Sequence, residues 1–378
     1  MKLFDVYSLL DMEPVKASGA YLWDKEGVEY LDFYGGHAVI SIGHSHPHYI
    51  EKITDQLSKI GFYSNAVVNS LQVELAEKLG ELSGYADYEL FLCNSGAEAN
   101  ENALKLASFT TGRERVLAMK AAFHGRTSMA VAVTDNPKIQ APVNRTDKVS
   151  FVALNDIEAL KKELATGEYA AVIIEPIQGV GGIQVASDEF LKAAREACDA
   201  TGTMLIIDEI QAGYGRSGKF FAHQWSGVKA DIITLAKGIA NGFPVGAVMI
   251  SPAIPASKGM LGTTFGGSHL ACAAAIAVAD VVKAENLVEN ARKMGEKIVE
   301  GIKGVSGVKD VRGRGLMIGI DLSVKQAAFR KVLREKHHIM TGLSGEYTLR
   351  LLPPLMIGEK EVERFVEAFK STAEEMGM

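Results

Sequence analysis

The chain has 378 residues, of which 47% are hydrophobic, so it can form one large domain and a smaller one around a sizeable core. Its formal net charge of −6 gives no electrostatic reason to expect a nucleic acid or an anionic membrane as a partner. No apolar run reaches the roughly 18 residues of a membrane span, and no secretory signal is evident. The three cysteines, Cys93, Cys198 and Cys272, are widely spaced and odd in number, which is typical of unpaired thiols in a reducing cytoplasm. We therefore expect a cytoplasmic protein.

The first 45 residues contain two short strand-like runs, at 20–23 and 30–33. A turn then leads into a helix that starts at Pro47. Four histidines in this region raise the question of a metal site: His37, His44, His46 and His48. No cysteine or carboxylate pattern completes such a site, so we expect no metal.

Seven short apolar runs alternate with amphipathic, helix-like stretches between residues 89 and 250. Apolar strands joined by helical crossovers predict an α/β fold with a large, mostly parallel sheet that is covered on both faces. The seven runs span 90–93, 116–119, 149–152, 170–174, 204–207, 232–235 and 247–250.

After Ser268 the pattern changes to that of an α+β unit. An Ala-rich helix is followed by helical patterns at 286–303, 324–336 and 359–376 and by strand-like runs at 308–311, 315–321 and 349–352. We therefore place a large domain at 46–260. Residues 1–45 and 261–378 are assigned to a smaller domain.

Two titratable residues each follow a buried strand: Asp208 follows the run at 203–207, and Lys237 follows the run at 232–235. An amine for an aldehyde and a carboxylate for a ring nitrogen are what pyridoxal phosphate requires. A lone lysine is more often a solvated surface residue. The pairing with Asp208, together with the turn described next, favours the cofactor interpretation.

The segment Asn94-Ser95-Gly96-Ala97 joins the run at 90–93 to a helix that extends to about Ser108. Small residues at a strand-to-helix turn leave free backbone N–H groups, which form a binding site for a phosphate. The alternative is an ordinary helix N-cap by Asn94 or Ser95.

The segment from Gly213 to Gly218 matches the spacing G-x-G-x-x-G of a dinucleotide-binding loop. That motif needs its first glycine directly after a strand and a full helix after its third. Residues 209–212 intervene before Gly213, so an NAD-type oxidoreductase is disfavoured.

The segment Phe123-His124-Gly125-Arg126 follows the run at 116–119. The aromatic ring can stack on a cofactor ring, and the arginine can bind a carboxylate in bidentate fashion. The alternative is a core phenylalanine and a surface arginine.

Together these motifs resemble the class III aminotransferases, of the pyridoxal phosphate fold type I superfamily. The similarity extends over nearly the whole chain. It includes further motifs that begin at Tyr30, Gly43, Glu175, Thr264 and Arg312.

The resemblance implies pyridoxal 5′-phosphate as cofactor, with Lys237 bound to it and moving protons and Asp208 ionised against the ring nitrogen. Gln211 would contact the ring hydroxyl, Phe123 would stack on the ring, and Gly96 and Ala97 would bind the phosphate. The implied cofactor-binding set is Ser95, Gly96, Ala97, Phe123, His124, Asp208, Gln211, Lys237 and Thr264. Since Thr264 would reach the phosphate of a neighbouring subunit, a homodimer with shared active sites is expected.

The implied reaction moves the δ-amino group between an N-acylornithine, acetyl or succinyl, and 2-oxoglutarate or glutamate, in arginine biosynthesis. Arg126 would hold the α-carboxylate of the acylornithine, Arg350 would hold that of glutamate or 2-oxoglutarate, and Glu175 completes the substrate-binding set. The alternative within the class is another ω-aminotransferase, acting on ornithine, 4-aminobutyrate or a lysine-pathway amine.

The chain departs from the family at two positions. Val180 stands where the family has a glutamate that pairs with the arginine at position 350, so either Arg350 stays open, Glu346 replaces that glutamate, or the acyl substrate brings a carboxylate of its own. His37 stands where the family has isoleucine. We expect it to be buried and satisfied, and the alternative is a polar contact near the substrate.

Overall fold

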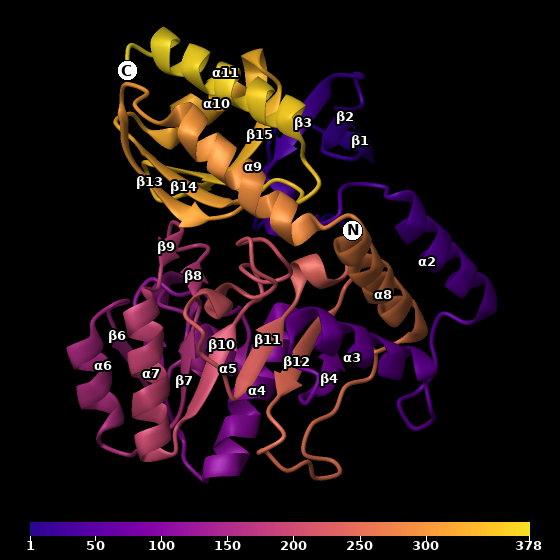
Figure 1. Cartoon of the computed structure of the whole chain (residues 1–378), viewed down its shortest axis with the longest axis vertical. Helices are drawn as coiled ribbons and strands as arrows, with labels where there is room; N and C mark the ends of the chain where they lie inside the picture. Colours follow the sequence, from indigo (N-terminus) through magenta and orange to yellow (C-terminus); the bar gives the residue numbers. More distant parts are fainter.

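The computed structural model describes residues 1–378. Its two main sheets have seven strands each (Figure 1). The larger sheet has the order β4-β12-β11-β10-β7-β5-β6. Only β12 runs against its neighbours, so the sheet is mostly parallel. The fold class and the seven predicted strands are confirmed: β4 (Glu89–Cys93), β5 (Arg115–Met119), β6 (Val149–Val152), β7 (Tyr169–Ile174), β10 (Met204–Asp208), β11 (Ile232–Leu235) and β12 (Gly246–Ile250).

Helices cover both faces of this sheet because its strands are apolar on both sides. On one face, side chains such as Ile173 and Ile206 form a core with α4 (Gly96–Thr111). On the other face, their neighbours Val172 and Leu205 belong to a larger core that includes residues of four further helices around this sheet. These are α3 (Ser70–Ser83), α6 (Ile157–Leu164), α7 (Asp188–Thr201) and α8 (His269–Ala284).

The parallel strands β4, β5, β7, β10 and β11 all end at the same edge of the sheet. The loops that follow parallel strands meet at such an edge, which is where ligands bind in open α/β sheets. The topology therefore places five segments at this edge of the sheet, those after Cys93, Met119, Ile174, Asp208 and Leu235.

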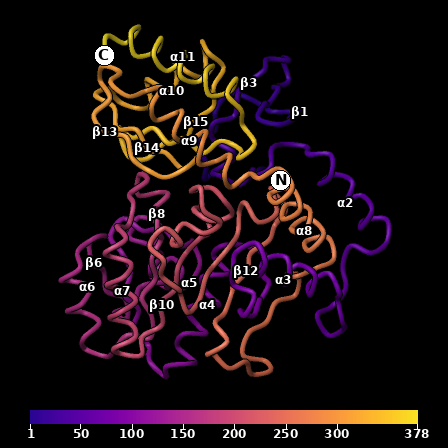
Figure 2. Tube along the Cα trace, in the orientation of Figure 1, coloured from indigo at the N-terminus to yellow at the C-terminus, as the bar shows by residue number.

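The smaller sheet combines the two ends of the chain in the order β1-β2-β3-β15-β16-β14-β13. Figure 2 shows the indigo N-terminal strands beside the yellow C-terminal part of the trace. The sequence did not predict β15, which pairs in parallel with β3. The strands are β1 (Pro14–Ser18), β2 (Tyr21–Asp24), β3 (Glu29–Phe33), β13 (Val308–Arg314), β14 (Met317–Leu322), β15 (Ile339–Ser344) and β16 (Thr348–Leu351).

Three helices pack with this sheet: α9 (Leu287–Ile302), α10 (Gln326–Lys336) and α11 (Glu359–Glu375). The Ala-rich α8 contacts α9, and it also contacts α3 and α2 (Pro47–Lys59). The domain boundaries at 46–260 and 261–378 stay a prediction, since α8 packs on elements of both units. No helix combines the length and the hydropathy that crossing a bilayer requires.

Short elements complete the chain. The hairpin of β8 (Ile177–Gln178) and β9 (Gln184–Val185) follows β7, and α5 (Ser128–Ala132) follows β5. A left-handed turn lies at α1 (Gly35–Ala38), where all four residues have φ between 55° and 67°.

Candidate active site

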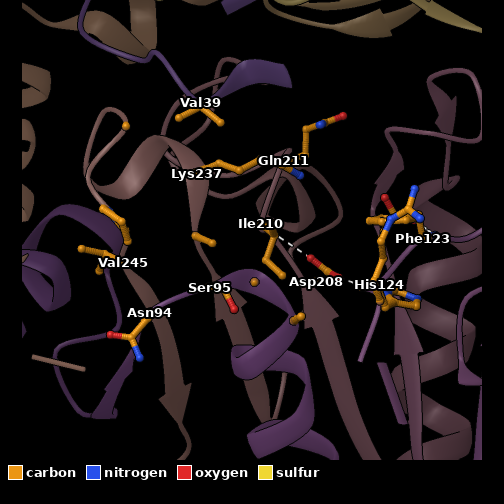
Figure 3. Close-up of a pocket in the computed structure, with 18 of the residues that line it drawn as sticks. Val39, Asn94, Ser95, Phe123, His124, Asp208, Ile210, Gln211, Lys237 and Val245 are labelled. Atoms are coloured by element: carbon orange, nitrogen blue, oxygen red, sulfur yellow. Dashed lines mark hydrogen bonds and ion pairs between the residues drawn. The ribbon is translucent and has the colours of Figure 1, made fainter. Parts of the chain in front are cut away.

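A cavity of about 410 Å³ opens at the edge where the parallel strands end. Its walls come from the segments that follow β4, β5, β7, β10 and β11 and from the segment before β12 (Figure 3). Two of the twelve predicted site residues, Thr264 and Arg350, are not part of the lining. The other ten line it: Ser95, Gly96, Ala97, Phe123, His124, Arg126, Glu175, Asp208, Gln211 and Lys237.

Asp208 is the last residue of β10, and its side chain is buried. Its Oδ2 accepts hydrogen bonds from Asn100 Nδ2 at 2.8 Å and from His124 Nδ1 at 2.7 Å. Its Oδ1 accepts one from the backbone N–H of Ile210 at 3.0 Å. Figure 3 shows the contacts with His124 and Ile210 as dashed lines. Three donors thus fix the carboxylate, which still has lone pairs for a donor on a ligand.

Asn100 is a functional residue that the sequence reasoning missed. It is fully buried in α4. Its Nδ2 also donates to the carbonyl of His124 at 2.7 Å, and its Oδ1 accepts from the Thr234 hydroxyl at 2.8 Å. The available signal is its spacing, because Asn100 lies three and seven residues before the buried Ala103 and Ala107, on the core face of the helix.

The turn before α4 contains the helix cap that we gave as the alternative to a phosphate site. Ser95 caps the helix, and its Oγ accepts a hydrogen bond from the backbone N–H of Glu98 at 3.2 Å. Gly96 and Ala97 are the first residues of α4, so their N–H groups have no partner inside the helix. A Cβ at Gly96 would lie 2.9 Å from Cδ1 of Ile210, so only glycine fits there without a shift. The cap prediction is confirmed, and the anion site stays a prediction.

Lys237 follows β11 and begins a short 3-10 turn, Lys237–Ile239. Its φ of 50° lies in the left-handed region, which residues with a side chain adopt mainly where function or surroundings require it. Burial lowers the pKa of its ammonium group, while Asp208 and Glu175 act in the opposite direction. The side chain is therefore an amine that loses its proton more easily than an exposed lysine.

Glu175 lines the cavity and is buried. Its Oε1 accepts from the backbone N–H of Phe123 at 2.9 Å, and its Oε2 accepts from that of Gly179 at 3.0 Å. Burial raises the pKa of this carboxyl group above its ordinary value. Glu175 therefore ties the segments after β5 and β7 together at the cavity.

Gln211 is held by the left-handed turn of α1. Its Nε2 donates to the carbonyl of His37 at 3.1 Å, and its Oε1 is buried without a partner. A Cβ at Gly179 would lie 1.9 Å from that oxygen, so glycine is needed there to admit the Gln211 side chain. The unpaired acceptor leaves a place for a hydroxyl donor of a ligand.

Phe123 and Arg126 both line the cavity. Phe123 is partly buried, and Arg126 is exposed. Arg126 has no ion pair with any carboxylate of the chain, so its guanidinium is available to an anion.

Arg350 lies in β16 outside the lining and is only 4% exposed. Its Nη1 donates to the carbonyl of Gly179 at 2.7 Å. Glu346 is not its partner, because Glu346 pairs with Lys325 at 3.6 Å and both side chains are exposed. The option that Glu346 replaces the family glutamate is therefore wrong.

The expectation that His37 is buried is also wrong. Its ring is exposed, and Nε2 lies 2.6 Å from the Tyr34 hydroxyl. The left-handed backbone at His37, with φ of 67°, turns the ring outward, and histidine is enriched in this conformation. Exposure is not complete: the partial burial of the imidazole lowers its pKa, as do the charges of Arg350 and Lys237.

The other sequence features considered above, the three further histidines, the glycine-rich segment and Thr264, lie outside the cavity lining. His44, His46 and His48 each bond a different carboxylate, of Asp32, Glu285 and Asp280. The segment from Gly213 to Gly218 starts five residues after β10, and only a 3-10 turn at Ala222–Trp225 follows, so it lacks the geometry of a dinucleotide loop. Thr264 is exposed in the loop before α8.

Residues 6–373 match the family model of the aminotransferase class-III family, so the chain belongs to the class III aminotransferases. It is 41% identical to the acetylornithine aminotransferase of Archaeoglobus fulgidus over 93% of this chain and 93% of that protein. Identity to the [LysW]-aminoadipate semialdehyde/glutamate semialdehyde transaminase of Sulfolobus acidocaldarius is 38% over 96% of this chain and 95% of that protein. The crystal structure of ornithine aminotransferase from Toxoplasma gondii matches with a TM-score of 0.93 at 28% identity, covering 99% of this chain and 93% of that chain.

The enzyme uses pyridoxal 5′-phosphate, and the cavity suits this cofactor. It offers the Lys237 amine, the Asp208 carboxylate and the start of α4 around one space. The buried Gln211 Oε1 and His124 Nε2 have no partner within the chain. A polar ligand that reaches these atoms satisfies groups that are otherwise costly to bury.

Proposed function

We propose that the enzyme transfers the δ-amino group between an N-acylornithine and 2-oxoglutarate or glutamate, as a step of arginine biosynthesis. The observation that carries this proposal is that Lys237, Asp208 and Arg126 line one and the same cavity. The N-acylornithine part is supported by relatives 41% identical to the chain that are named acetylornithine aminotransferases.

Bound pyridoxal phosphate supplies an aldehyde for amine exchange and a ring that takes up electrons from the amine-bearing carbon. We assign covalent attachment and proton transfer to Lys237, whose lowered pKa makes the uncharged, nucleophilic amine easier to form. Asp208 would accept a hydrogen bond from the protonated ring nitrogen, and His124 and Asn100 hold Asp208 in place. Gly96 and Ala97 hold the phosphate at the helix N-terminus.

We assign the remaining contacts with the cofactor and the substrates to other predicted site residues. Phe123 would stack on the cofactor ring, and the unpaired Oε1 of Gln211 would accept from the ring hydroxyl. Arg126 binds the α-carboxylate of the acylornithine in bidentate fashion, and Arg350 binds that of glutamate. Glu175 holds the two segments that contain Phe123 and Gly179 beside each other.

We further propose a homodimer in which Thr264 reaches the partner's phosphate. Next to Thr264, the rings of Phe265 and Phe62 are in contact at 5.5 Å between centroids, yet they are 62% and 44% exposed, which is unusual for aromatic residues of a monomer surface. Mixing Lys237→Ala subunits with Thr264→Ala subunits should restore activity, because one site of each heterodimer then carries neither change. A fully active monomer in sedimentation would exclude sharing.

We place the enzyme in the cytoplasm. All three cysteines are buried and free, which suits a reducing compartment. Fractionation of cells that express the tagged chain tests this location, and recovery outside the cytoplasm would contradict it.

The experiment that tests the activity compares half-reactions of the holoenzyme with N-acetylornithine, N-succinylornithine, ornithine and 4-aminobutyrate. We expect the two acylornithines to react fastest. The second candidate is another ω-aminotransferase, and the match to ornithine aminotransferase favours it over unrelated activities. Faster reaction with ornithine or 4-aminobutyrate would establish that candidate instead.

The Lys237→Ala variant tests the site itself. We expect it to bind cofactor without covalent attachment and to lose transamination by about 10²–10⁴-fold or more. Borohydride treatment should fix the cofactor to the parent chain and to a Lys258→Ala control, since Lys258 is exposed, but not to the variant. Turnover of Lys237→Ala near the parent rate would assign the role to another lysine.

A further inference from the structure

The glycine-rich segment Gly213–Gly218 lies in the loop after β10 and packs closely on helix α9 of the smaller sheet. A Cβ at Gly215 would lie 3.1 Å from Cγ2 of Val288. One at Gly218 would lie 2.9 Å from Cβ of Arg292. Both glycines also have a positive φ, of 86° and 84°. These glycines therefore serve a close approach between the loop and α9, which side chains at the two positions would obstruct.

Arg216, in the middle of this segment, bonds two points of the smaller sheet. Its Nη1 donates to the carbonyl of Leu316 at 3.1 Å and to the carbonyl of Pro353 at 2.7 Å. Its own carbonyl accepts from the backbone N–H of Leu316 at 2.9 Å. A Cβ at Gly315 would lie 2.6 Å from that carbonyl oxygen, so glycine lets the turn between β13 and β14 approach. Arg216 thus connects the loop after β10 with this turn and with the chain that leaves β16.

The Arg216 guanidinium is buried, and no carboxylate of the chain pairs with it. Burial lowers its pKa to about 9, although the charge of Asp32 acts in the opposite direction. Arg314, which also joins the two sheets, is more exposed and pairs with Asp188 of α7 at 3.0 Å. Burying a charge without a charged partner costs free energy, so stability alone does not account for an arginine here. The two carbonyls that Arg216 holds in place give it a role.

On the side of the large sheet, Arg216 is connected to the active-site cavity through Gln211. Gln211 comes earlier in the same loop and lines that cavity together with Lys237. It also lines a second cavity, of about 10 Å³, together with Tyr214 and Arg216. Gln211 Oε1, the Tyr214 hydroxyl and Arg216 Nη2 are each buried without a partner in the chain. Arg216 therefore lies beside the residue that we assign to the ring hydroxyl of the cofactor.

On the side of the smaller sheet, Arg216 is connected to Arg350. Arg350 lies in β16, which ends at Leu351, and the carbonyl that Arg216 binds belongs to Pro353, soon after that end. The Arg350 side chain is buried, and its Nη1 donates to the carbonyl of Gly179 at 2.7 Å. A displacement of Pro353 therefore shifts the end of β16 and, with it, the guanidinium of Arg350.

We propose that Arg216 is a positioning residue that, through Pro353, holds Arg350 at a fixed place relative to the cofactor. This inference rests on the proposed function, in which Arg350 binds the α-carboxylate of glutamate. The carboxylate of N-acylornithine is assigned to Arg126, which follows β5 of the large sheet and has no contact with this connection. The two half-reactions therefore depend on Arg216 to different extents.

The test compares single-turnover half-reactions of the holoenzyme with L-glutamate and with N-acetylornithine. Arg216→Met removes the guanidinium and keeps an unbranched side chain. We expect the second-order rate constant for L-glutamate to fall about ten- to hundredfold, as for a binding group displaced by a fraction of an ångström to 1 Å. The rate constant for N-acetylornithine should stay close to that of the parent. Arg216→Lys keeps the charge and a donor, so it should show the same selective loss to a smaller extent.

Two further measurements distinguish positioning from a general structural effect. Glutarate has the two carboxylates of glutamate but no amine, so calorimetry reports its binding to the holoenzyme without any reaction. We expect Arg216→Met to weaken glutarate binding by about the same factor as it slows L-glutamate. The control is Arg314→Met, which removes another arginine between the two sheets and should leave both rate constants and the glutarate affinity unchanged. Urea unfolding verifies that each variant is folded, and Arg216→Lys decides the question if Arg216→Met is not.

The outcomes separate this inference from the proposed function. Equal losses in the two half-reactions, an unchanged glutarate affinity, or the same selective loss in Arg314→Met would each overturn the inference, even if N-acetylornithine is a good substrate. A parent enzyme that reacts with L-glutamate but not with N-acetylornithine overturns the proposed function. The inference is then decided by the L-glutamate reaction and the glutarate affinity of the Arg216 variants against Arg314→Met. A parent enzyme that does not react with L-glutamate overturns both.

Discussion

His124 Nδ1 lies 2.7 Å from Asp208 Oδ2, and both side chains are buried. The imidazole donates in this bond, because an ionised carboxylate can only accept. His124 comes from the segment after β5 and Asp208 from the end of β10, so the contact joins two loops at the edge of the sheet. The carboxylate is thus oriented before any cofactor binds, which is the preorganisation that electrostatic catalysis requires.

Asp208→Asn tests the need for a charge at this position. The amide is close to the size of the carboxylate but cannot balance a protonated ring nitrogen, and its NH₂ group meets the donors His124 and Asn100. We expect cofactor to be retained and kcat to fall roughly 10²–10³-fold. The control is Asp199→Asn, at an exposed carboxylate of α7 that pairs with Arg195, which should keep the parent rate. A kcat unchanged at full cofactor content would exclude the assigned role of Asp208.

Asn100→Asp tests the support of Asp208. The change places a second carboxylate where Nδ2 now lies 2.8 Å from Asp208, and two such groups cannot both ionise at this distance. It also removes the donor to the His124 carbonyl, so we expect a loss of about 1–3 kcal/mol in the free energy of unfolding. Urea unfolding and activity measurements at neutral pH would report both effects.

The matched control is Asn102→Asp on the same helix. Asn102 is partly exposed, and its Nδ2 bonds only the carbonyl of Glu98. We expect near-parent stability and activity for this variant. Equal effects of the two substitutions would mean that Asn100 acts through α4 in general and not through Asp208.

Local patterns were sufficient to predict the large sheet but not β15. Each strand of the large sheet is a continuous apolar run, and burial on both faces requires that pattern. The strand Ile339–Ser344 contains Gly342 and Ser344, and its partner β3 lies about 300 residues earlier in the chain. Its pairing is set by long-range contacts that a local window cannot detect.

The same distinction applies to the site. Lys237 and Asp208 could be predicted to lie close together because each is at, or two residues after, the end of an apolar strand. The spacing of Asn100 from Ala103 and Ala107 indicates a position on the core face of α4, but not its role. Its partners Asp208 and Thr234 are more than 100 residues away in sequence, and a polar residue in a helix is more often exposed. The exposure of the His37 ring depends on the left-handed turn at Gly35–Ala38. The two glycines before His37 do not by themselves predict that turn.

Gly246→Ala tests the turn that is expected to hold the phosphate. A Cβ at Gly246 would lie 2.4 Å from the carbonyl oxygen of Ser95, so the methyl group must displace the start of α4. We expect weaker cofactor binding and a loss of about 1–3 kcal/mol in stability from overpacking. Equilibrium dialysis and urea unfolding measure the two quantities. Gly262→Ala, where nothing lies within 4 Å of the new carbon, is the control. Parent-like cofactor affinity of Gly246→Ala would show that the turn does not hold the phosphate.

The pH dependence of stability tests the burial of Lys237. Burial lowers its pKa in the folded chain, while the unfolded chain keeps the ordinary value of 10.5. Between these two values the unfolded state binds one more proton, so the free energy of unfolding rises with pH across this window. Below the window, both states are charged, and the enclosed ammonium group destabilises the fold.

Lys237→Met removes the titrating group and keeps an unbranched side chain. The cofactor-free variant should therefore be more stable than the cofactor-free parent below the window, and the difference should shrink as the pH rises towards 10.5. Urea unfolding of both proteins at a series of pH values measures the difference in their free energies of unfolding. Titrating groups that the two proteins share contribute equally to both values and drop out of the difference. Lys258→Met, at an exposed lysine, should give no pH-dependent difference. A constant difference for Lys237→Met would mean that the amine titrates alike in both states, and its proposed ease of deprotonation would then be wrong.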